Sequence, residues 1–356
     1  MFDLSAQTKY DTCGYRNQRP REQRPRETGA AFIKSLSERK KTRMQLTEIG
    51  KNILTACLNV KAGETVLIVT DDLQYPIGQA LYEAAKELGA DGMLLTMGPR
   101  EVSGQEPPEA VAAAMAKADV VIAPMSTSIT HTNAKINAVK AGARVATMPG
   151  ITEEMFSQGA MTADYGVVLE LTRKVTDLLT KANRARIEKD GAVLTLNLTG
   201  RNGVPSPGVY RERGTAGNLP SGEAYIAPLE DGSDGETVID GSMVGVGLLD
   251  SPLRVKVEKG KLVSIEGKDA DKLGILLKNE ANGTLAELGI GTNYAARLTG
   301  NILEDEKALH TVHIAFGTNT SFGGTNKADC HMDGIIVNPT LYLDDLLVLE
   351  KGEFRV

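Results

Sequence analysis

Residues 65–70 read TVLIVT and residues 119–124 read DVVIAP, and these two stretches decide the fold class. Both are apolar and rich in β-branched side chains, which predicts strands buried on both faces of a parallel sheet. Similar stretches lie at 91–96 and 143–148, and helix-like segments lie at 74–88, 108–117, 130–141 and 151–158. Strands and helices therefore alternate, which predicts an α/β domain with helices on both faces of the sheet.

On either side of this alternating region the pattern changes. A helical stretch at 46–60 precedes it, and a long helix-like stretch at 165–184 ends it. After that come short strands and Gly-rich turns, with a loop at 201–220 that we expect to border a cleft. Candidate strands are 192–198, 236–240, 253–258, 262–266, 311–317 and 331–337, with a helical segment at 268–281. The sequence thus predicts an α/β domain at 44–184 and a β-rich domain at 185–356.

The turn after the first strand bears on cofactors. Parallel sheets that bind dinucleotides carry Gly-x-Gly-x-x-Gly at this point, whereas this chain has Thr70-Asp71-Asp72. Acidic side chains there would repel a pyrophosphate. We therefore expect the first domain to be a scaffold that binds no nucleotide.

The first 43 residues differ in charge from the rest of the chain. They contain 11 Lys and Arg against 5 Asp and Glu, which leaves a net charge of −12 on the remainder. An acidic body argues against nucleic acid as a partner. No apolar segment follows the basic residues, so they do not resemble a secretory signal. They are predicted to be a disordered leader, or an extension upstream of a true start at Met44.

Bulk composition predicts a globular protein. Hydrophobic residues make up 41% and charged residues 24% of 356 residues, and no apolar run approaches the ~20 residues of a membrane span. No membrane partner is expected. The three cysteines are far apart and form no Cys-x-x-Cys pair, which favours neither a disulfide framework nor a zinc knuckle. We expect a cytoplasmic location.

Three of the four histidines, His310, His313 and His331, fall within 22 residues. In His331-Met332-Asp333 the spacing of two puts the histidine and the aspartate on one face of a strand, so both can reach one metal ion. His313 shares a strand face with the small Ala315 and Gly317, which leaves room for an ion. His310 has the opposite parity and is expected to begin the strand or to support the site. His131 is expected to lie at the surface or to cap a helix.

Two glutamates extend this set. Glu223 and Glu287 both lie in apolar, strand-like surroundings. A buried carboxylate is costly unless it is paired or binds a cation, so metal ligation gives a physical reason for both. A purely structural role is the alternative interpretation, because a His-x-Asp pair is more often held by an ordinary hydrogen bond.

From Met44 to Val356 the chain resembles the aminopeptidase T and aminopeptidase S metallopeptidases. The matching segments are Asn218–Pro228, Glu287–Asn293, Glu304-Asp305-Glu306-Lys307, Val312–Gly317, Gly323-Gly324 and His331-Met332-Asp333-Gly334. The resemblance implies an α/β domain followed by a β-rich catalytic domain, and a homodimer. It also implies five metal ligands, which are Glu223, Glu287, His313, His331 and Asp333.

This resemblance predicts an aminopeptidase in which two divalent ions, Zn, Co or Mn, activate a water against the peptide bond of a peptide substrate. Glu287, or else Glu223, would act as general base. One position departs from the family, since its functional tyrosine is replaced by Thr320, whose shorter hydroxyl would have to bind the oxyanion. That change also allows a small non-peptide amide as substrate.

An alternative from another reaction class is a dioxygenase with one Fe(II) that opens the ring of a dihydroxypyridine. Such enzymes share the scaffold and resemble this chain at Cys330-His331-Met332-Asp333 and at Leu341-Tyr342-Leu343-Asp344-Asp345. They carry a histidine where this chain has Glu287 and do not retain the ligands at Glu223 and His313, although His313 could supply a second imidazole. A third hypothesis is a metal-binding protein without catalytic activity.

Overall fold

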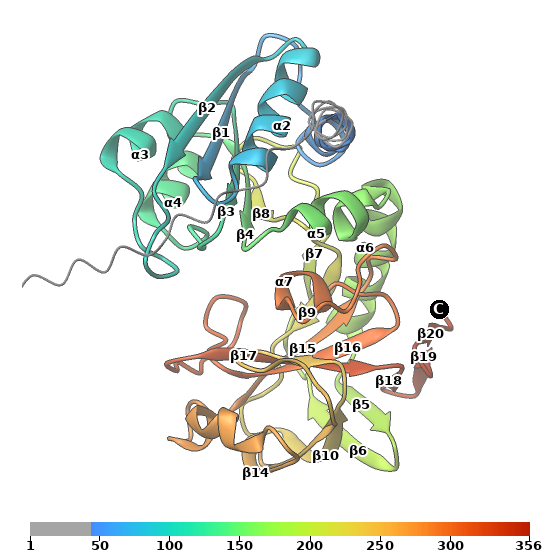
Figure 1. Ribbon diagram of the computed structural model, residues 1–356. Helices are drawn as coiled ribbons and strands as arrows, with labels where there is room; N and C mark the ends of the chain where they lie inside the picture. Colours follow the sequence, from blue (N-terminus) through green and yellow to red (C-terminus); the bar gives the residue numbers. More distant parts are fainter. Residues whose placement is uncertain (1–43) are drawn as a thin grey trace, which may run out of the picture. The chain divides into compact units, whose positions relative to one another are not determined.

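The computed structural model describes residues 44–356, so the predicted leader at 1–43 lies outside the described residues. After a helix at residues 44–56, the chain forms a five-stranded parallel sheet in the order β2-β1-β3-β4-β8 (Figure 1). Its strands are β1 Thr65–Asp71, β2 Asp91–Met97, β3 Val120–Met125, β4 Arg144–Pro149 and β8 Ala216–Asn218. The four strands predicted for this sheet are confirmed, each within one residue at either end.

Helices cover both faces of this sheet, because alternate residues of its strands enter two different cores. Val66 and Ile68 of β1 pack with α2, whereas Leu67 and Val69 pack with α3 and α4. Burying such side chains contributes roughly 1.5–3 kcal/mol each, which explains the uninterrupted apolar strands. The helices are α2 Tyr75–Glu87, α3 Glu109–Met115, α4 Asn133–Lys140, α5 Glu153–Gln158, η1 Ala160–Thr162 and α6 Tyr165–Lys181.

Two antiparallel sheets follow, with eight and seven strands. The first has the order β14-β13-β10-β6-β5-β18-β19-β20 and the second β12-β11-β17-β16-β15-β9-β7. The eight strands are β5 Arg184–Lys189, β6 Ala192–Asn197, β10 Ser233–Ile239, β13 Leu253–Glu258, β14 Lys261–Glu266, β18 Thr340–Leu343, β19 Leu346–Glu350 and β20 Glu353–Phe354. The seven are β7 Val204–Ser206, β9 Glu223–Ile226, β11 Ser242–Met243, β12 Gly247–Leu248, β15 Leu285–Gly291, β16 Thr311–Gly317 and β17 His331–Val337. The predicted fold class is confirmed.

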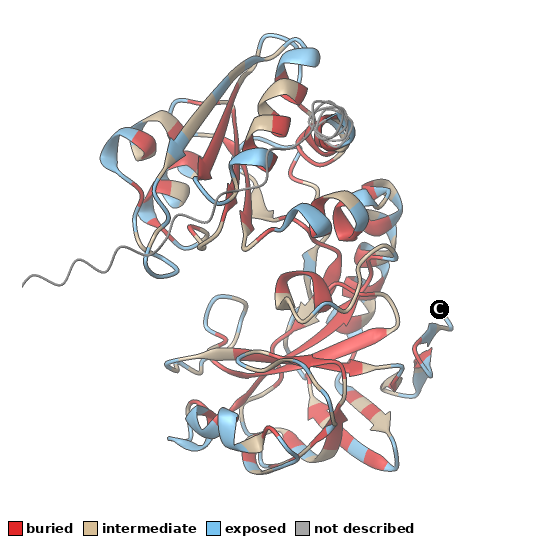
Figure 2. Ribbon diagram, viewed as in Figure 1, coloured by how far each residue is buried: buried red, intermediate tan, exposed pale blue. Residues whose placement is uncertain are grey.

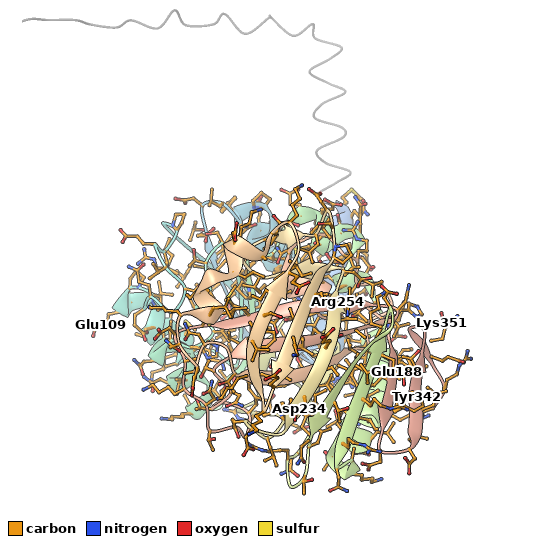
Figure 3. The ribbon with its side chains drawn as sticks, turned by 90° about the horizontal axis from the view of Figure 1, so that it is seen from below. Glu109, Glu188, Asp234, Arg254, Tyr342 and Lys351 are labelled. Carbon is orange, nitrogen blue, oxygen red and sulfur yellow. The ribbon has the colours of Figure 1, made fainter. Side chains whose placement is uncertain are left out.

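One apolar core joins the two antiparallel sheets and helix α6. Ile187 and Leu194 of the eight-stranded sheet share it with Leu288 and Ile314 of the seven-stranded sheet, and these residues are fully buried (Figure 2). The other face of the eight-stranded sheet carries charged side chains such as Asp234 (Figure 3). The seven-stranded sheet likewise turns one face, with Leu288 and Ile314, to the shared core, so its other face is left for polar side chains.

The predictions about short elements are confirmed in part. A helical segment does lie within 268–281, and residues of the segment 201–220 do line a pocket, but the details differ. Residues 268–281 contain the 3-10 helix η2, Ala270–Leu277, and a separate helix α7 spans Ile302–Asp305. The predicted loop at 201–220 contains β7 and β8, and β8 returns to pair with β4 in the parallel sheet. Strands of three residues carry too little periodicity to be read from sequence. The division into domains at residues 184 and 185 stays a prediction.

Within residues 44–356, no helix combines the length and the apolar character that crossing a bilayer requires.

Candidate metal centre

The polar face of the seven-stranded sheet gathers the predicted ligands. Strand parity does this, because Leu288, Ile314 and Met332 enter the apolar core while the residues next to them point the other way. Register completes the arrangement. Ala315 of β16 pairs with Glu287 of β15 on one side and with Asp333 of β17 on the other. The small side chain between the two carboxylates leaves space in front of the sheet.

Glu287 lies between the two histidines. Its Oε1 is 3.4 Å from Nε2 of His313, and its Oε2 is 3.3 Å from Nε2 of His331. The same Nε2 of His331 is 3.4 Å from Oδ1 of Asp333. Glu287 and Asp333 are each 6% exposed, and His313 is 0% exposed. Two imidazoles and two carboxylates thus converge, and all of them are buried except His331, which is partly exposed.

The orientation of each histidine has a visible cause. Nδ1 of His331 donates to the carbonyl oxygen of Thr318 at 2.8 Å, which leaves its Nε2 directed at the carboxylates. The ring of His313 lies against Gly289, where a Cβ would be 2.0 Å from its Nε2. Glycine at 289 is therefore required for the ring of His313 to occupy this place.

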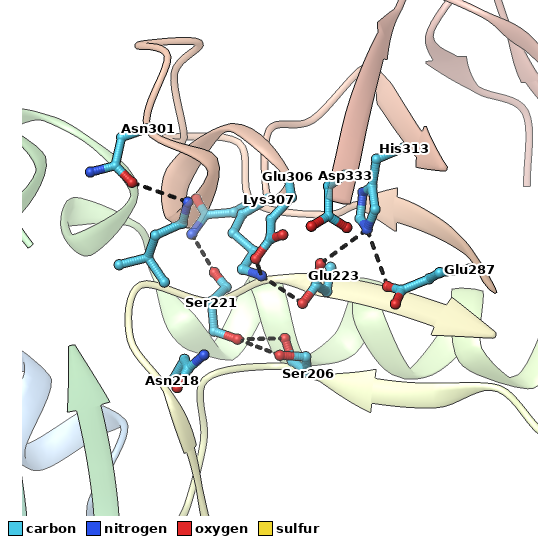
Figure 4. Close-up of polar contacts among 12 residues, drawn as sticks. Ser206, Asn218, Ser221, Glu223, Glu287, Asn301, Glu306, Lys307, His313 and Asp333 are labelled. Atoms are coloured by element: carbon cyan, nitrogen blue, oxygen red, sulfur yellow. Dashed lines mark hydrogen bonds and ion pairs between the residues drawn. The ribbon is translucent and has the colours of Figure 1, made fainter. Parts of the chain in front are cut away.

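Glu223 lies on the other side of His313, and its Oε2 is 3.5 Å from Nε2 of that residue. Its Oε1 accepts a hydrogen bond of 2.6 Å from Nζ of Lys307, which also contacts Glu306 (Figure 4). Lys307 is only 2% exposed. The sequence analysis named Lys307 only as part of a matching segment and predicted no role for it. The feature that could have identified it is its position directly after three acidic residues and shortly before the strand of His313.

Opposite charges shift the pKa values of three groups in the metal-free protein. Burial opposes the charged form of each group, but contacts with partners outweigh it. Hydrogen bonds from His313 and His331 lower the pKa of Glu287 to about 2. Burial lowers the pKa of both histidines, but their carboxylate partners raise it further. Glu287 and Glu223 raise the pKa of His313 to about 9. Asp333 and Glu287 raise the pKa of His331 to about 12. Both imidazoles therefore hold a proton at neutral pH until a cation replaces it.

We expect metal binding to weaken as the pH falls from about 9 to about 6, because the raised pKa of His313 keeps it protonated below about 9. Protons and metal compete for the same nitrogen atoms, so each proton released changes the apparent affinity by up to about tenfold per pH unit. Calorimetric titration at pH 7 in two buffers of different ionisation enthalpy counts the released protons. Binding without proton release would contradict the pKa values.

The residues fit a divalent cation. Oε2 of Glu223 is buried and has no hydrogen-bond partner within residues 44–356, although it faces Nε2 of His313. Ligand atoms of Glu287, His313 and Asp333 lie within 4.8 Å of one another, as do those of Glu223, Glu306 and His313. Carboxylate and imidazole together suit first-row transition metals. The chain has groups that could hold a metal ion, as predicted.

A pocket of about 520 Å³ opens in front of these side chains. Tyr225 and Phe322 form an aromatic wall, with ring centroids 5.3 Å apart at an interplanar angle of 85°. Phe322 also meets the ring of His331 edge-on, with centroids 5.9 Å apart. The pocket is further lined by polar residues, which are Thr130, His131, Ser206, Asn218, Glu223, Glu287, Glu306, Lys307, Thr318, Ser321, His331 and Asp333.

The structure also places three other residues that the sequence analysis discussed. His310 directly precedes β16, as expected of a residue that begins the strand, and His131 is exposed at the surface, also as expected. Thr320 is exposed and lines no part of this pocket, because the turn after β16 brings Ser321 and Phe322 to it instead. His310 points away, with Nδ1 3.1 Å from the carbonyl oxygen of Gly352. His131 lines the pocket, whereas the cap of helix α4 is Thr132. Its signal was its position just beyond β3, at the carboxyl edge of a parallel sheet, where ligands commonly bind.

Two solved structures share this fold. The structure of a 2,5-dihydroxypyridine dioxygenase from Pseudomonas putida KT2440 superposes with a TM-score of 0.73 and 21% identity, covering 88% of this chain and 97% of that one. Wild-type AmpT from Thermus thermophilus superposes with a TM-score of 0.67 and 17% identity, covering 88% and 99%. These likenesses confirm the scaffold that the sequence analysis expected, and they show the fold alone.

Sequence likeness points to one of these two. The 2,5-dihydroxypyridine 5,6-dioxygenase of Pseudomonas putida is 28% identical over 172 residues, 42% of this chain and 47% of that enzyme, so the match spans about half of the relative. Residues 45–356 match the model of the NicX family, described as 2,5-dihydroxypyridine 5,6-dioxygenase. The prediction of an aminopeptidase, a hydrolase and protease, is therefore wrong. This chain belongs to the 2,5-dihydroxypyridine 5,6-dioxygenase family.

Proposed function

We propose that this chain is a metal-dependent dioxygenase that opens the ring of a dihydroxypyridine, the alternative that the sequence analysis held beside the peptidase. The family match supports this reaction class. The observation in the structure that carries it is the carboxylate of Glu287 between the two histidines, at 3.4 Å and 3.3 Å, beside a pocket with an aromatic wall.

The donor set supports a single Fe(II). Two imidazoles and one carboxylate are the usual ligands of non-haem Fe(II) in oxygenases. His313 and His331 would supply the imidazoles, and Asp333 or Glu287 the carboxylate. When bound, Fe(II) supplies the site with redox chemistry toward O₂. The predictions of two ions, of Zn, Co or Mn, and of Glu223 as a ligand stay predictions.

The pocket supports a small planar substrate. Its volume of about 520 Å³ lies in the range of sites for small molecules. The edge-to-face pair of Tyr225 and Phe322 offers an apolar surface for an aromatic ring, since aromatic rings prefer edge or offset contacts. His131 and Asn218, which also line the pocket, offer hydrogen bonds to ring oxygens. Together they would hold the ring facing Glu287 and His331.

Ring opening by a dioxygenase breaks one carbon–carbon bond of the ring, and each carbon takes one atom of the same O₂ molecule. The ring supplies the electrons, so no external reductant is consumed. A hydroxyl proton has to leave the substrate and return to the product. Burial raises the pKa of Glu306 to about 7, although the charge of Lys307 lowers it. Because Glu306 lines the pocket, it can hold that proton near neutral pH.

The test is oxygen uptake by protein loaded with Fe(II) under anaerobic conditions and then mixed with 2,5-dihydroxypyridine and ¹⁸O₂. We expect one O₂ consumed per ring opened, and two heavy oxygen atoms in the product. His313→Ala and His331→Ala should each lose the activity, whereas His310→Ala, whose side chain points away from the pocket, should keep it.

Iron-loaded protein that consumes no O₂ with dihydroxypyridines, or a product with a single heavy oxygen atom, would refute the proposal. The expected homodimer and the cytoplasmic location stay predictions.

A further inference from the structure

Strand register places Tyr225 beside the candidate metal centre. Glu223 and Tyr225 are two residues apart on β9, so they share the polar face of the sheet, while the residues that alternate with them enter the apolar core. Tyr225 pairs with Gly289 of β15, and Gly289 pairs on its other side with His313 of β16. Because glycine has no side chain, β15 places no side chain between Tyr225 and His313 at this level of the sheet.

The hydroxyl group of Tyr225 has no partner in the protein. Within residues 44–356, no side chain or backbone group forms a hydrogen bond with it. Other tyrosines use theirs, since Tyr210 donates to a backbone carbonyl oxygen at 2.8 Å and Tyr294 accepts from a backbone N–H at 2.6 Å. Tyr225 is partly buried and lines the pocket, so its hydroxyl is left for a molecule inside the pocket.

The chemistry of this hydroxyl favours an oxygen atom as its partner. A tyrosine hydroxyl keeps its proton at neutral pH, so it can donate a hydrogen bond. The proposed substrate brings two ring oxygens into the pocket, and each can accept one. One of them gains negative charge when its proton leaves, and a donor that is already in place stabilises such charge without reorganisation.

We infer that Tyr225 is a substrate-binding residue whose hydroxyl donates a hydrogen bond to one of the two ring oxygens of the substrate. This inference rests on the proposed function and deepens it, because it assigns part of the selection of a dihydroxy ring to a side chain that is not a candidate metal ligand. The ring of Tyr225 packs edge-to-face with Phe322, while its hydroxyl recognises the oxygen. Sites built to bond an oxygen bind poorly the ligands that lack it.

The test is calorimetric titration of Fe(II)-loaded protein in the absence of O₂, so that no turnover occurs. The ligands are 2,5-dihydroxypyridine, 2-hydroxypyridine and 3-hydroxypyridine, and each of the last two keeps one of the ring oxygens. Tyr225→Phe removes one oxygen atom and keeps the ring. It is expected to weaken binding of the dihydroxy compound and of one monohydroxy compound by about five- to tenfold, the size of one hydrogen bond, and to leave the other unchanged.

Two control variants separate the hydroxyl from the ring. Tyr342→Phe removes the same hydroxyl from strand β18, where the ring packs against Arg186 outside the pocket, and all three affinities should stay unchanged. Phe322→Leu should weaken all three ligands to a similar extent, because a contact with the ring does not depend on which oxygen is present. Iron content is matched among the variants before each titration.

Two outcomes overturn the inference. One is a Tyr225→Phe protein that binds all three ligands as the wild type does, and the other is an equal loss for all three, which is the effect of a disturbed wall. The readout is separate from the reaction. The expected pattern of affinities without any oxygen uptake would refute the proposed function alone, and unchanged affinities with full oxygen uptake would refute this inference alone.

Discussion

Glu287→Ala is expected to lower both the affinity for Fe(II) and the rate of ring opening by more than about 100-fold, since even partners outside the ligand shell typically contribute 10–100-fold. The carboxylate contacts both His313 and His331. Without it the site loses one of the carboxylates that could bind the ion, and one negative charge beside the two imidazoles. Iron content after anaerobic loading and oxygen uptake measure the two effects separately.

The matched control is Glu236→Ala. Glu236 also lies on a β-strand and also has a charged partner, with Oε2 2.9 Å from Arg254, but it belongs to the eight-stranded sheet and is about two-fifths exposed. Its loss should change neither iron content nor rate. A Glu287→Ala protein with full iron and full activity would show that the site lies elsewhere.

Gly289→Ala is expected to displace His313 and to abolish iron binding, although it adds a single methyl group. The new Cβ would lie 2.0 Å from Nε2 and 2.1 Å from Cε1 of His313. The ring is 0% exposed, so it cannot swing aside without disturbing its neighbours, and overpacking of this kind costs about 1–3 kcal/mol of folding free energy. Thermal unfolding and iron content are the measurements.

Gly274→Ala is the matched control, because it adds the same methyl group at a position where the methyl group meets no neighbour. Gly274 lies in the 3-10 helix η2, and a Cβ there would have no atom within 4 Å. That variant should bind iron and unfold as the wild type does. Normal iron binding by Gly289→Ala would mean that the orientation of His313 does not depend on the space beside Gly289.

The parallel sheet was predictable because its signal is long and regular. Strands β1, β3 and β4 are apolar runs buried on both faces, the edge strand β2 is partly exposed, and helices of ordinary length separate the four. Strand parity also placed His331 and Asp333 together and Met332 in the core. These predictions needed only the repeat of two residues along a strand.

Other site residues could not be predicted because they depend on tertiary contacts. A lysine in an acidic stretch normally lies in solvent, yet Lys307 is buried by carboxylates that reach it from β9 and from its own turn. The conformation of residues 318–326 follows from hydrogen bonds to Asn319 and Glu230, which bring Phe322 and not Thr320 to the pocket. Reaction class was equally hidden, since two classes of enzyme share the scaffold and imidazole and carboxylate ligands serve both.

Strand β8 belongs by sequence to the second half of the chain but by strand pairing to the parallel sheet of the first half. It lies 32 residues beyond the start of β5, yet it completes the parallel sheet beside β4, and five residues after its last residue, Asn218, the chain reaches Glu223. A fragment ending at residue 184 would leave β4 as an open edge, and unpaired edges invite association with other chains. Anyone who wishes to express the first half by itself, or to graft the second half onto another partner, has to decide to which piece residues 216–218 belong.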